Sequence, residues 1–289
     1  MYDDVLLPVD ENATSSAVLR HASELAHWAD ATVTLLYVAD TARDSVTVVE
    51  ASVVDALEQQ GRDVVDEAAE TLANLGADYE TDIVQGDPAT TIVDYAERYD
   101  YDLIVMPTQG REGVSRYLLG SVSEKVVRLS PVPVLTSRMR DDEKLVFPYE
   151  RVLVPTDGSD AAAAAADHGL GLAASLEAAV HVLSVVDDGP DLRSSTIEEA
   201  STEAARAAVE SVAADARDRG IDDVRTHVED GAPDEVILDA VETHDLHAVV
   251  MGTTGRRGIT RILLGSVAEK TVRSAPVPVI TVHGPDDSE

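Results

Sequence analysis

Short apolar runs and longer segments of helical periodicity alternate along the first half of the chain. The apolar runs predict buried strands at residues 5–9, 32–38, 79–84, 103–106 and 132–136. Between them, apolar side chains at helical spacing predict helices at residues 15–28, 46–75, 88–99 and 121–129. Gly76 is expected to end the long second helix and Pro88 to begin the third.

The same pattern restarts after a charged segment. Strands are predicted at residues 152–155, 180–186, 224–228, 248–250 and 277–282, and helices at 160–176, 196–219, 233–243 and from 266. Strands that alternate with helices at this spacing predict two α/β units with parallel sheets. Pro133 and Pro278 fall inside the last predicted strand of each half, which favours a sheet edge.

The chain accordingly divides into two domains of similar length. We predict a first domain at residues 1–137, a linker at 138–149, a second domain at 150–283 and an acidic tail at 284–289. The linker is charged and ends in Phe147-Pro148-Tyr149. At 289 residues the chain is long enough for two separate cores.

A glycine-bearing loop follows the apolar run at residues 248–250. It contains Gly252 and Gly255, and it reaches Gly265-Ser266 where a new helical pattern begins. Glycines let the backbone approach an anion, and the free N–H groups of a helix start then bind it. Ser266 is expected at the N-cap with Glu269 three residues on, a capping box that offers the serine a purely structural role.

A near copy of this loop lies in the first half, and this internal repeat is the strongest feature of the sequence. Gly110 matches Gly255, and Gly120-Ser121 matches Gly265-Ser266. Pro107 stands where Gly252 stands, which removes an N–H and fixes φ near about −65°. Glycines in both loops also have a simpler use, which is to turn the chain.

Two aspartates follow the first predicted strand of each half, namely Asp10 and Asp157. Ligands of parallel α/β sheets bind at the carboxyl ends of the strands, where the strand order reverses. We therefore expect each aspartate, the end of the second strand and the glycine loop to converge on one crevice per half. The alternative is that each aspartate caps the helix that follows it.

The charge of the chain is strongly acidic, with a formal net charge of −33. The acidic residues are spread along the whole sequence, which indicates a salt-rich cytoplasm, as in a halophile, and disfavours nucleic-acid binding. No apolar run is long enough to span a membrane, and the start has no basic segment typical of a signal peptide. The chain has no cysteine, which excludes disulfides and thiolate chemistry.

No catalytic constellation is evident, because both the G-x-S-x-G elbow and the phosphate loop with its lysine are missing. His244 and His247 are spaced to share a metal ion, but no third ligand is evident, so we expect them to be solvent-exposed and predict no metal site. Lys125 and Lys270 in first helical turns are a weak indication of a nearby anion or carboxylate.

These residues together resemble the universal stress protein family, as two domains in tandem. The family signature is Gly, two residues, Gly, nine residues, Gly, then Ser or Thr, and Gly252, Gly255, Gly265 and Ser266 fit it. Residues 154–159, Val-Pro-Thr-Asp-Gly-Ser, and 231–233, Gly-Ala-Pro, also match. The resemblance implies a Rossmann-like α/β fold of strand order 3-2-1-4-5 that binds an adenine nucleotide, with ATP in the glycine-bearing subclass.

The resemblance also implies roles for single residues. Adenine would contact Asp157 and the backbone of Val185, the loop glycines would approach ribose and phosphates, and Ser266 with the amides of Val267 and Ala268 would hold the phosphate end. Mg²⁺ can accompany ATP through the phosphate oxygens. The matching residues of the first half are Asp10, Val38, Gly110, Gly120, Ser121, Val122 and Ser123.

The first half departs from the family pattern at Pro107 and at Asn12, which replaces the serine seen at Ser159, so the second half is the better site. Members of the family commonly dimerise through the fifth strand, which implies a dimer of chains or a pairing of the two halves. The main hypothesis is a cytoplasmic stress-response protein that binds ATP. The alternatives are a slow ATPase and a nucleotide-free pseudo-dimer that acts through protein partners.

The acidic surface generates a prediction about salt. Repulsion between carboxylates is screened over about 10 Å at 0.1 M salt but over about 3 Å at 1 M. We expect the melting temperature to fall when salt is lowered below about 0.5 M, because the repulsion is then poorly screened. Differential scanning calorimetry across a salt series measures this, and a melting temperature insensitive to salt contradicts the interpretation.

Overall fold

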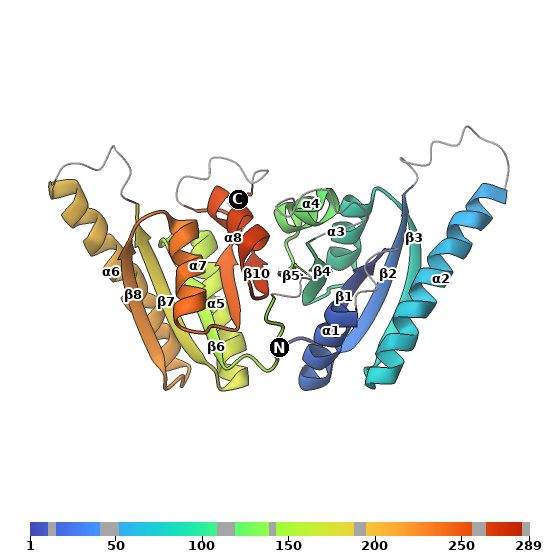
Figure 1. Ribbon diagram of the computed structural model, residues 1–289, viewed down its shortest axis with the longest axis horizontal. Coiled ribbons are helices and arrows are strands. Elements are labelled where there is room, and N and C mark those ends of the chain that lie inside the picture. The colour runs from blue at the N-terminus through green and yellow to red at the C-terminus, as the bar shows by residue number, and fades with distance from the viewer. Residues whose placement is uncertain are drawn as a thin grey trace. The chain divides into compact units, whose positions relative to one another are not determined.

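The computed structural model describes residues 1–10, 16–40, 52–108, 119–138, 143–187, 195–255 and 264–284 (Figure 1). The chain divides into two compact units, Met1–Asp141 and Asp142–Glu289.

The first unit alternates strands and helices as the sequence predicts. Its elements are β1 (Asp4–Val9), α1 (Ser16–Ala29), β2 (Thr32–Asp40), α2 (Ser52–Leu75), β3 (Tyr79–Gly86), α3 (Pro88–Arg98), β4 (Leu103–Pro107), α4 (Ser121–Leu129) and β5 (Val134–Ser137). The part of the second predicted helix before residue 52 lies outside the described residues.

The second unit repeats this order. Its elements are β6 (Arg151–Pro155), α5 (Asp160–Leu176), β7 (Ala179–Val186), α6 (Ser195–Asp218), β8 (Val224–Asp230), α7 (Pro233–Thr243), β9 (Ala248–Gly252), α8 (Ser266–Ser274) and β10 (Val279–Val282).

All strand pairs within each unit are parallel. The first unit has the order β3-β2-β1-β4-β5 and the second the order β8-β7-β6-β9-β10, so both follow the expected 3-2-1-4-5. Right-handed crossovers place the first two helices of a unit on one face and the last two on the other. Accordingly, α1 packs beside α2 and α3 beside α4, and the second unit repeats both pairs. The α/β fold class is confirmed.

The core of each unit lies between its sheet and its helices. The central strands β1 and β4 are buried along nearly their whole length, as expected for parallel strands covered on both faces. Tyr2 and Tyr149 precede the first strand of each unit, and both are fully buried. Tyr149 belongs to the segment expected as a linker, so the end of that segment packs into the core of the second unit.

Two local predictions at helix ends are confirmed, namely the end of the second helix at Gly76 and the start of the third at Pro88. Gly76 and Gly220 end the two long helices with φ of 77° and 82°, a left-handed conformation that glycine adopts without strain. Asp87 caps α3 by accepting the Thr90 N–H at 3.1 Å, and Pro88 begins that helix.

The prediction that Pro133 and Pro278 lie inside the last strand of each unit is wrong. Pro133 and Pro278 directly precede β5 and β10. Proline has no N–H to donate, but its carbonyl can still accept a hydrogen bond from the neighbouring strand. The Pro133 carbonyl accepts the Ile104 N–H at 2.9 Å, and the Pro278 carbonyl accepts the Val249 N–H at 3.0 Å.

No helix in the described part of the chain combines the length and apolarity needed to cross a membrane.

A histidine occurs at the equivalent place on the first helix of each unit. His21 on α1 is 1% exposed, and burial lowers its pKa to about 4. His168 on α5 is partly buried, and desolvation likewise lowers its pKa to about 4 against the opposing effect of Asp167. Both histidines therefore favour the neutral form in the folded protein.

The two histidines lead to a prediction about how folding stability depends on pH, at pH values above those where most carboxylates titrate. Because the unfolded chain binds protons on these histidines below about pH 6.5 and the folded chain does not, stability is complete above that pH and falls as the pH is lowered towards 4. Between pH 7.5 and 5.5 we expect His21 to contribute about 1 kcal/mol of this loss. Denaturant unfolding at fixed salt measures it.

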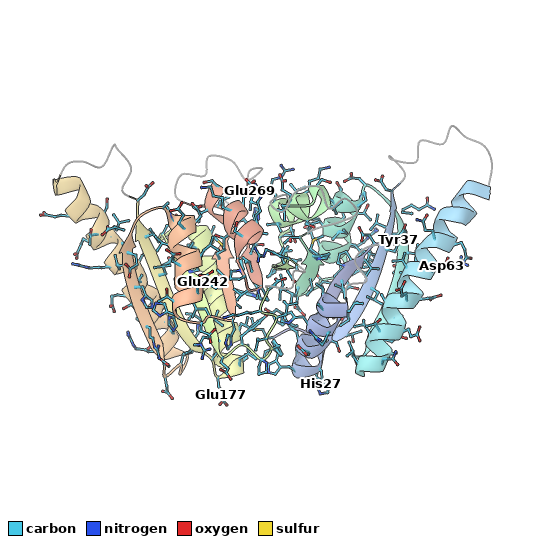
Figure 2. All side chains as sticks on the ribbon, in the orientation of Figure 1. His27, Tyr37, Asp63, Glu177, Glu242 and Glu269 are labelled. Atoms are coloured by element: carbon cyan, nitrogen blue, oxygen red, sulfur yellow. The ribbon has the colours of Figure 1, made fainter. Side chains whose placement is uncertain are left out.

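The control for this prediction is on the same helix. His27 is exposed on α1 (Figure 2). The His21→Leu variant should lose part of the pH dependence in this window, whereas His27→Leu should retain it. Equal pH dependence in His21→Leu and the unmodified protein would contradict the assignment.

Candidate functional site

A cavity of about 690 Å³ lies at the carboxyl ends of β6, β7 and β9 in the second unit. Its walls include the ends of these strands, the loop after β9, and residues of α5, α6, α7 and α8. All eight residues that the sequence predicts for this half line it, namely Asp157, Val185, Gly252, Gly255, Gly265, Ser266, Val267 and Ala268. The volume lies within the range of small-molecule sites.

Asp157 is held in place by the residue that begins the next helix. Its Oδ1 accepts the Ser159 N–H at 3.0 Å and the Ser159 hydroxyl at 2.6 Å. Ser159, and not Asp157, is the N-cap of α5, and its Oγ accepts the Ala162 N–H at 3.3 Å. Since Ser159 already caps the helix, the alternative capping role for Asp157 does not account for the aspartate.

The backbone of Val185 faces the cavity because β7 runs beyond the end of β6. The Thr156 N–H donates to the Leu183 carbonyl at 2.8 Å, and the pairing of β6 with β7 ends at Pro155 and Leu183. Alternate residues of a strand direct their backbone groups to the same neighbour. The N–H and C=O of Val185 therefore point to the β6 side, past the last residue that pairs with β7.

The start of α8 differs from the sequence prediction. Gly265 is the N-cap, and Ser266 is the first residue of the helix, so the expected capping box of Ser266 and Glu269 is wrong. The Glu269 N–H donates to the Gly265 carbonyl at 2.9 Å, while the Glu269 side chain accepts from Arg273. Because the N-cap is a glycine, it offers no side chain to the amides of the first turn. The first amides of α8 therefore face the cavity with the partial positive charge of a helix N-terminus.

The glycines of the loop serve two different purposes. A Cβ at Gly252 would lie 2.8 Å from the backbone carbon and oxygen of Ala161, so this glycine is required for close packing against α5. A Cβ at Gly255 would lie 2.7 Å from Oδ2 of Asp157, which places this glycine directly beside the aspartate. Gly265 donates its N–H to the Thr253 carbonyl at 2.8 Å, and this bond closes the loop.

The first unit places its predicted residues on the equivalent elements. Asp10 follows β1, Val38 lies near the end of β2, and Gly120 caps α4 without a side-chain hydrogen bond. The Gly120 N–H donates to the Thr108 carbonyl at 2.7 Å, as Gly265 does to Thr253. The helix start consists of Ser121, Val122 and Ser123. Gly110 lies outside the described residues.

Ser123 and Ala268, equivalent in the repeat, differ in their contacts. The buried Ser123 hydroxyl donates to the Pro107 carbonyl at 2.7 Å, so it ties α4 to the end of β4. Ala268 has no hydroxyl and cannot make this bond in the second unit.

An aromatic ring occupies the space in the first unit that corresponds to part of the cavity. Ser184 and Ala205 line the cavity in the second unit, and the repeat aligns them with Tyr37 and Gly61. Tyr37 is 7% exposed, and a Cβ at Gly61 would lie 2.7 Å from its ring (Figure 2). Gly61 on α2 therefore makes room for the ring. Sequence reasoning missed this pair, although the Ser-to-Tyr difference was visible in the repeat.

The two lysines in first helical turns each lie near a carboxylate. Lys270 Nζ lies 3.1 Å from Asp234, and Lys125 Nζ lies 3.9 Å from Asp87. The carboxylates account for the lysines, so they are not evidence for a phosphate. Arg111, Arg256 and Arg257 of the glycine loops lie outside the described residues.

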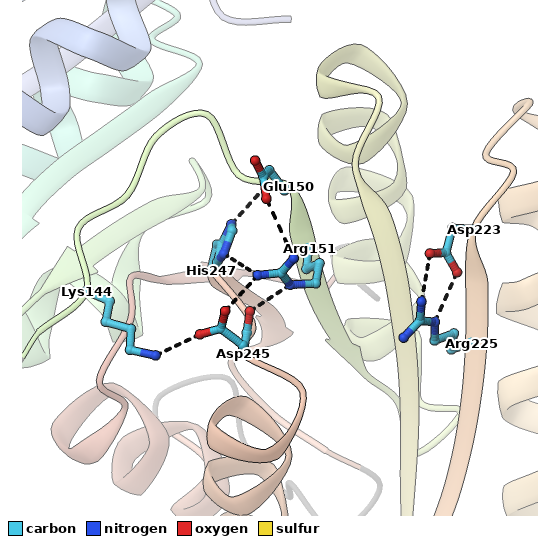
Figure 3. Close-up of polar contacts among 7 residues, drawn as sticks. All are labelled: Lys144, Glu150, Arg151, Asp223, Arg225, Asp245 and His247. Atoms are coloured by element: carbon cyan, nitrogen blue, oxygen red, sulfur yellow. Dashed lines mark hydrogen bonds and ion pairs between the residues drawn. The ribbon is translucent and has the colours of Figure 1, made fainter.

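The expectation that His247 is solvent-exposed is wrong, because it is 7% exposed. Its Nδ1 accepts the Glu150 N–H at 3.0 Å, and the Arg151 guanidinium lies 2.9 Å from its Nε2 (Figure 3). Arg151 also binds the Asp245 carboxylate at 2.8 Å, as does Lys144 at 2.8 Å. His247 thus belongs to a polar cluster that fixes the turn between α7 and β9 and does not pair with His244.

Comparisons with known proteins agree on one family. The model of the universal stress protein family matches residues 1–138 and 148–283. A universal stress protein of Methanocaldococcus jannaschii is 35% identical over 158 residues, which cover 53% of this chain and 91% of that protein. A universal stress protein of Mycolicibacterium smegmatis is 29% identical over 291 residues, 96% of each chain.

A solved structure supports the same relationship. The crystal structure of a universal stress protein from Archaeoglobus fulgidus matches with a TM-score of 0.73 and 26% identity, covering 97% of this chain and 98% of that one. The likeness to this known structure therefore extends over nearly the whole length of both chains.

The two purposes of the loop glycines lead to a stability prediction. We expect Gly252→Ala to destabilise the second unit by about 1–3 kcal/mol, because the new methyl meets the rigid backbone of Ala161. Gly255→Ala should cost less, since its methyl meets the end of one side chain, Asp157, and not rigid backbone. Denaturant unfolding in molar salt compares the two variants, and equal losses would contradict this division of roles.

Proposed function

The chain belongs to the universal stress protein family, and we propose that its second unit binds ATP in the cavity at the ends of β6, β7 and β9. The observation that carries the proposal is the convergence of the uncapped α8 N-terminus, the glycine loop and Asp157 on one cavity of about 690 Å³. The role that follows is that of a nucleotide-binding protein of the stress response.

The adenine end is placed beside Asp157 and Val185. A carboxylate oxygen can accept a hydrogen bond from the exocyclic amine of adenine. A backbone N–H and C=O can form hydrogen bonds with the edge of the ring. Oδ1 of Asp157 is fixed by Ser159, so the orientation of the carboxylate is set before any ligand arrives. The walls around this position are mostly apolar, as a purine requires, and include Pro155, Leu183, Ile237 and Met251.

The phosphate end is placed at the start of α8. The amides of Val267 and Ala268 and the exposed Ser266 hydroxyl supply donors, and the helix N-terminus favours negative charge. Gly255 and Gly265 let the chain pass close to the ribose and the phosphates.

Mg²⁺ is the proposed companion of the nucleotide. Asp157, Asp187 and Asp234 all line the cavity, and a triphosphate would bring further negative charge among these carboxylates. A divalent cation on the phosphate oxygens reduces this repulsion without a dedicated protein cage.

The first unit is proposed to bind nucleotide weakly or not at all. Pro107 lacks the N–H of the matching glycine, and the ring of Tyr37 occupies space that Ser184 leaves open in the second unit. We therefore expect a stoichiometry near one nucleotide per chain.

The proposed setting is the salt-rich cytoplasm of a halophile, for which the net charge of −33 is the supporting observation. Association through the fifth strands, β5 and β10, stays a prediction, either between copies of the chain or within one.

Isothermal titration calorimetry with ATP in about molar salt tests the proposal. We expect about one site per chain, tighter binding with Mg²⁺, loss of binding in Gly255→Val and binding weakened about tenfold in Ser266→Ala, since a hydrogen bond to a charged phosphate is lost. The matched control is Ser121→Ala at the equivalent position of the first unit, which should bind as the unmodified chain does.

The outcomes separate the alternatives. No heat of binding in a folded protein would overturn the proposal and leave the nucleotide-free pseudo-dimer. Steady phosphate release that disappears in Gly255→Val would instead indicate the slow ATPase.

A further inference from the structure

Three histidines from different elements of the second unit lie together, away from the nucleotide cavity. His181 lies on β7, His227 on β8, and His244 is the C-cap residue of α7. His181 precedes Val185 by four positions on the same strand, which corresponds to about 13 Å. The cluster and the cavity are therefore separate places on the unit.

The distances in this histidine cluster are those of potential metal ligands. One ring nitrogen from each histidine lies within 4.8 Å of the others. Nδ1 of His181 and Nε2 of His227 are 3.2 Å apart. Zn–N bonds of about 2.0–2.1 Å in a tetrahedral site place two nitrogens about 3.4 Å apart, so His181 and His227 already have the spacing of two ligands of one ion.

One buried nitrogen atom of the cluster has no hydrogen-bond partner among the described residues. His181 is fully buried, and its Nε2 has no hydrogen-bond partner among the described residues. A buried nitrogen without a partner is unfavourable by about 1–3 kcal/mol. An ion bound at Nδ1 would leave this Nε2 without a partner, so the penalty shows only that an apolar residue would pack here at lower cost and that packing alone does not explain the histidine.

The electrostatic surroundings suit a cation. His244 ends α7, and the C-terminus of a helix carries partial negative charge. Arg225 lies nearby, but Asp223 pairs with it through bonds of 3.1 and 3.0 Å (Figure 3).

The first unit provides an internal comparison. The positions equivalent to the three histidines are Thr34, Asp82 and Tyr99. There the Tyr95 hydroxyl donates to Asp82 at 2.8 Å, and the rings of Tyr95 and Tyr99 pack with centroids 4.6 Å apart. The same place in the fold is thus filled by tyrosines and a carboxylate, so the fold itself does not require histidine in the second unit.

We propose that His181, His227 and His244 bind one divalent transition-metal ion, for which Zn²⁺ is the best fit. Three imidazoles leave a fourth tetrahedral position for water. The ion would join the end of α7 to β7 and β8. Because Pro233 and Ile237 of α7 line the nucleotide cavity, metal binding also stiffens one wall of that cavity.

The test uses the full chain without a polyhistidine tag, without nucleotide, in about molar NaCl and with excess Mg²⁺ to occupy surface carboxylates. Zn²⁺ is titrated by calorimetry, and Co²⁺ is used as a spectroscopic probe, since tetrahedral Co²⁺ absorbs visibly. We expect one Zn²⁺ per chain, Co²⁺ absorption that Zn²⁺ abolishes, and a melting temperature raised by Zn²⁺.

Two variants and one control make the test specific. His227→Gln should weaken Zn²⁺ binding about tenfold or more and lose the Co²⁺ absorption, as should His244→Gln, whose partly exposed position lets the fold survive the change. His27→Gln on the exposed face of α1 should bind as the unmodified chain does. Absence of Zn²⁺ binding in the unmodified chain, or binding unchanged in His244→Gln, would overturn the proposal and leave the cluster as packing.

Discussion

The hydrogen bond from the Gly265 N–H to the Thr253 carbonyl is the constraint on which the candidate site depends. It closes the loop between β9 and α8, so that the helix begins beside the strand ends with Gly265 at its N-cap. The glycine at the N-cap has no side chain to cover the first turn, and the first three residues of the helix line the cavity. The first unit makes the same bond between Gly120 and Thr108, which shows that the closure belongs to the fold and not to one site.

What differs between the units is the surroundings of this closed loop. In the second unit, Ser184 and Ala205 leave open the space that Tyr37 and Gly61 fill in the first. Near the other end of the same strands, the second unit has three histidines where the first has a threonine, an aspartate and a tyrosine. One backbone framework therefore carries two sets of side chains, and we propose that the second set binds a nucleotide and a metal ion.

Local features of the sequence predict most of the fold. Apolar runs predict the strands, Gly76 the end of α2 and Pro88 the start of α3, because each depends on neighbours within a few residues. Ser266 is expected as an N-cap because serine is a preferred capping residue, but the helix begins one residue earlier, where a distant carbonyl binds Gly265. The histidine cluster and the Tyr37–Gly61 contact depend on strand register and helix packing, which periodicity alone does not specify.

Hydrogen exchange of the backbone amides at the start of α8, with and without Mg²⁺ and ATP, tests the central claim most directly. The account predicts that exchange at Ser266, Val267 and Ala268 slows when ATP is added, while the equivalent amides of Ser121, Val122 and Ser123 change little. This comparison uses two copies of one helix start within the same chain and sample. Equal protection of both helix starts, or no change at α8, would contradict the account.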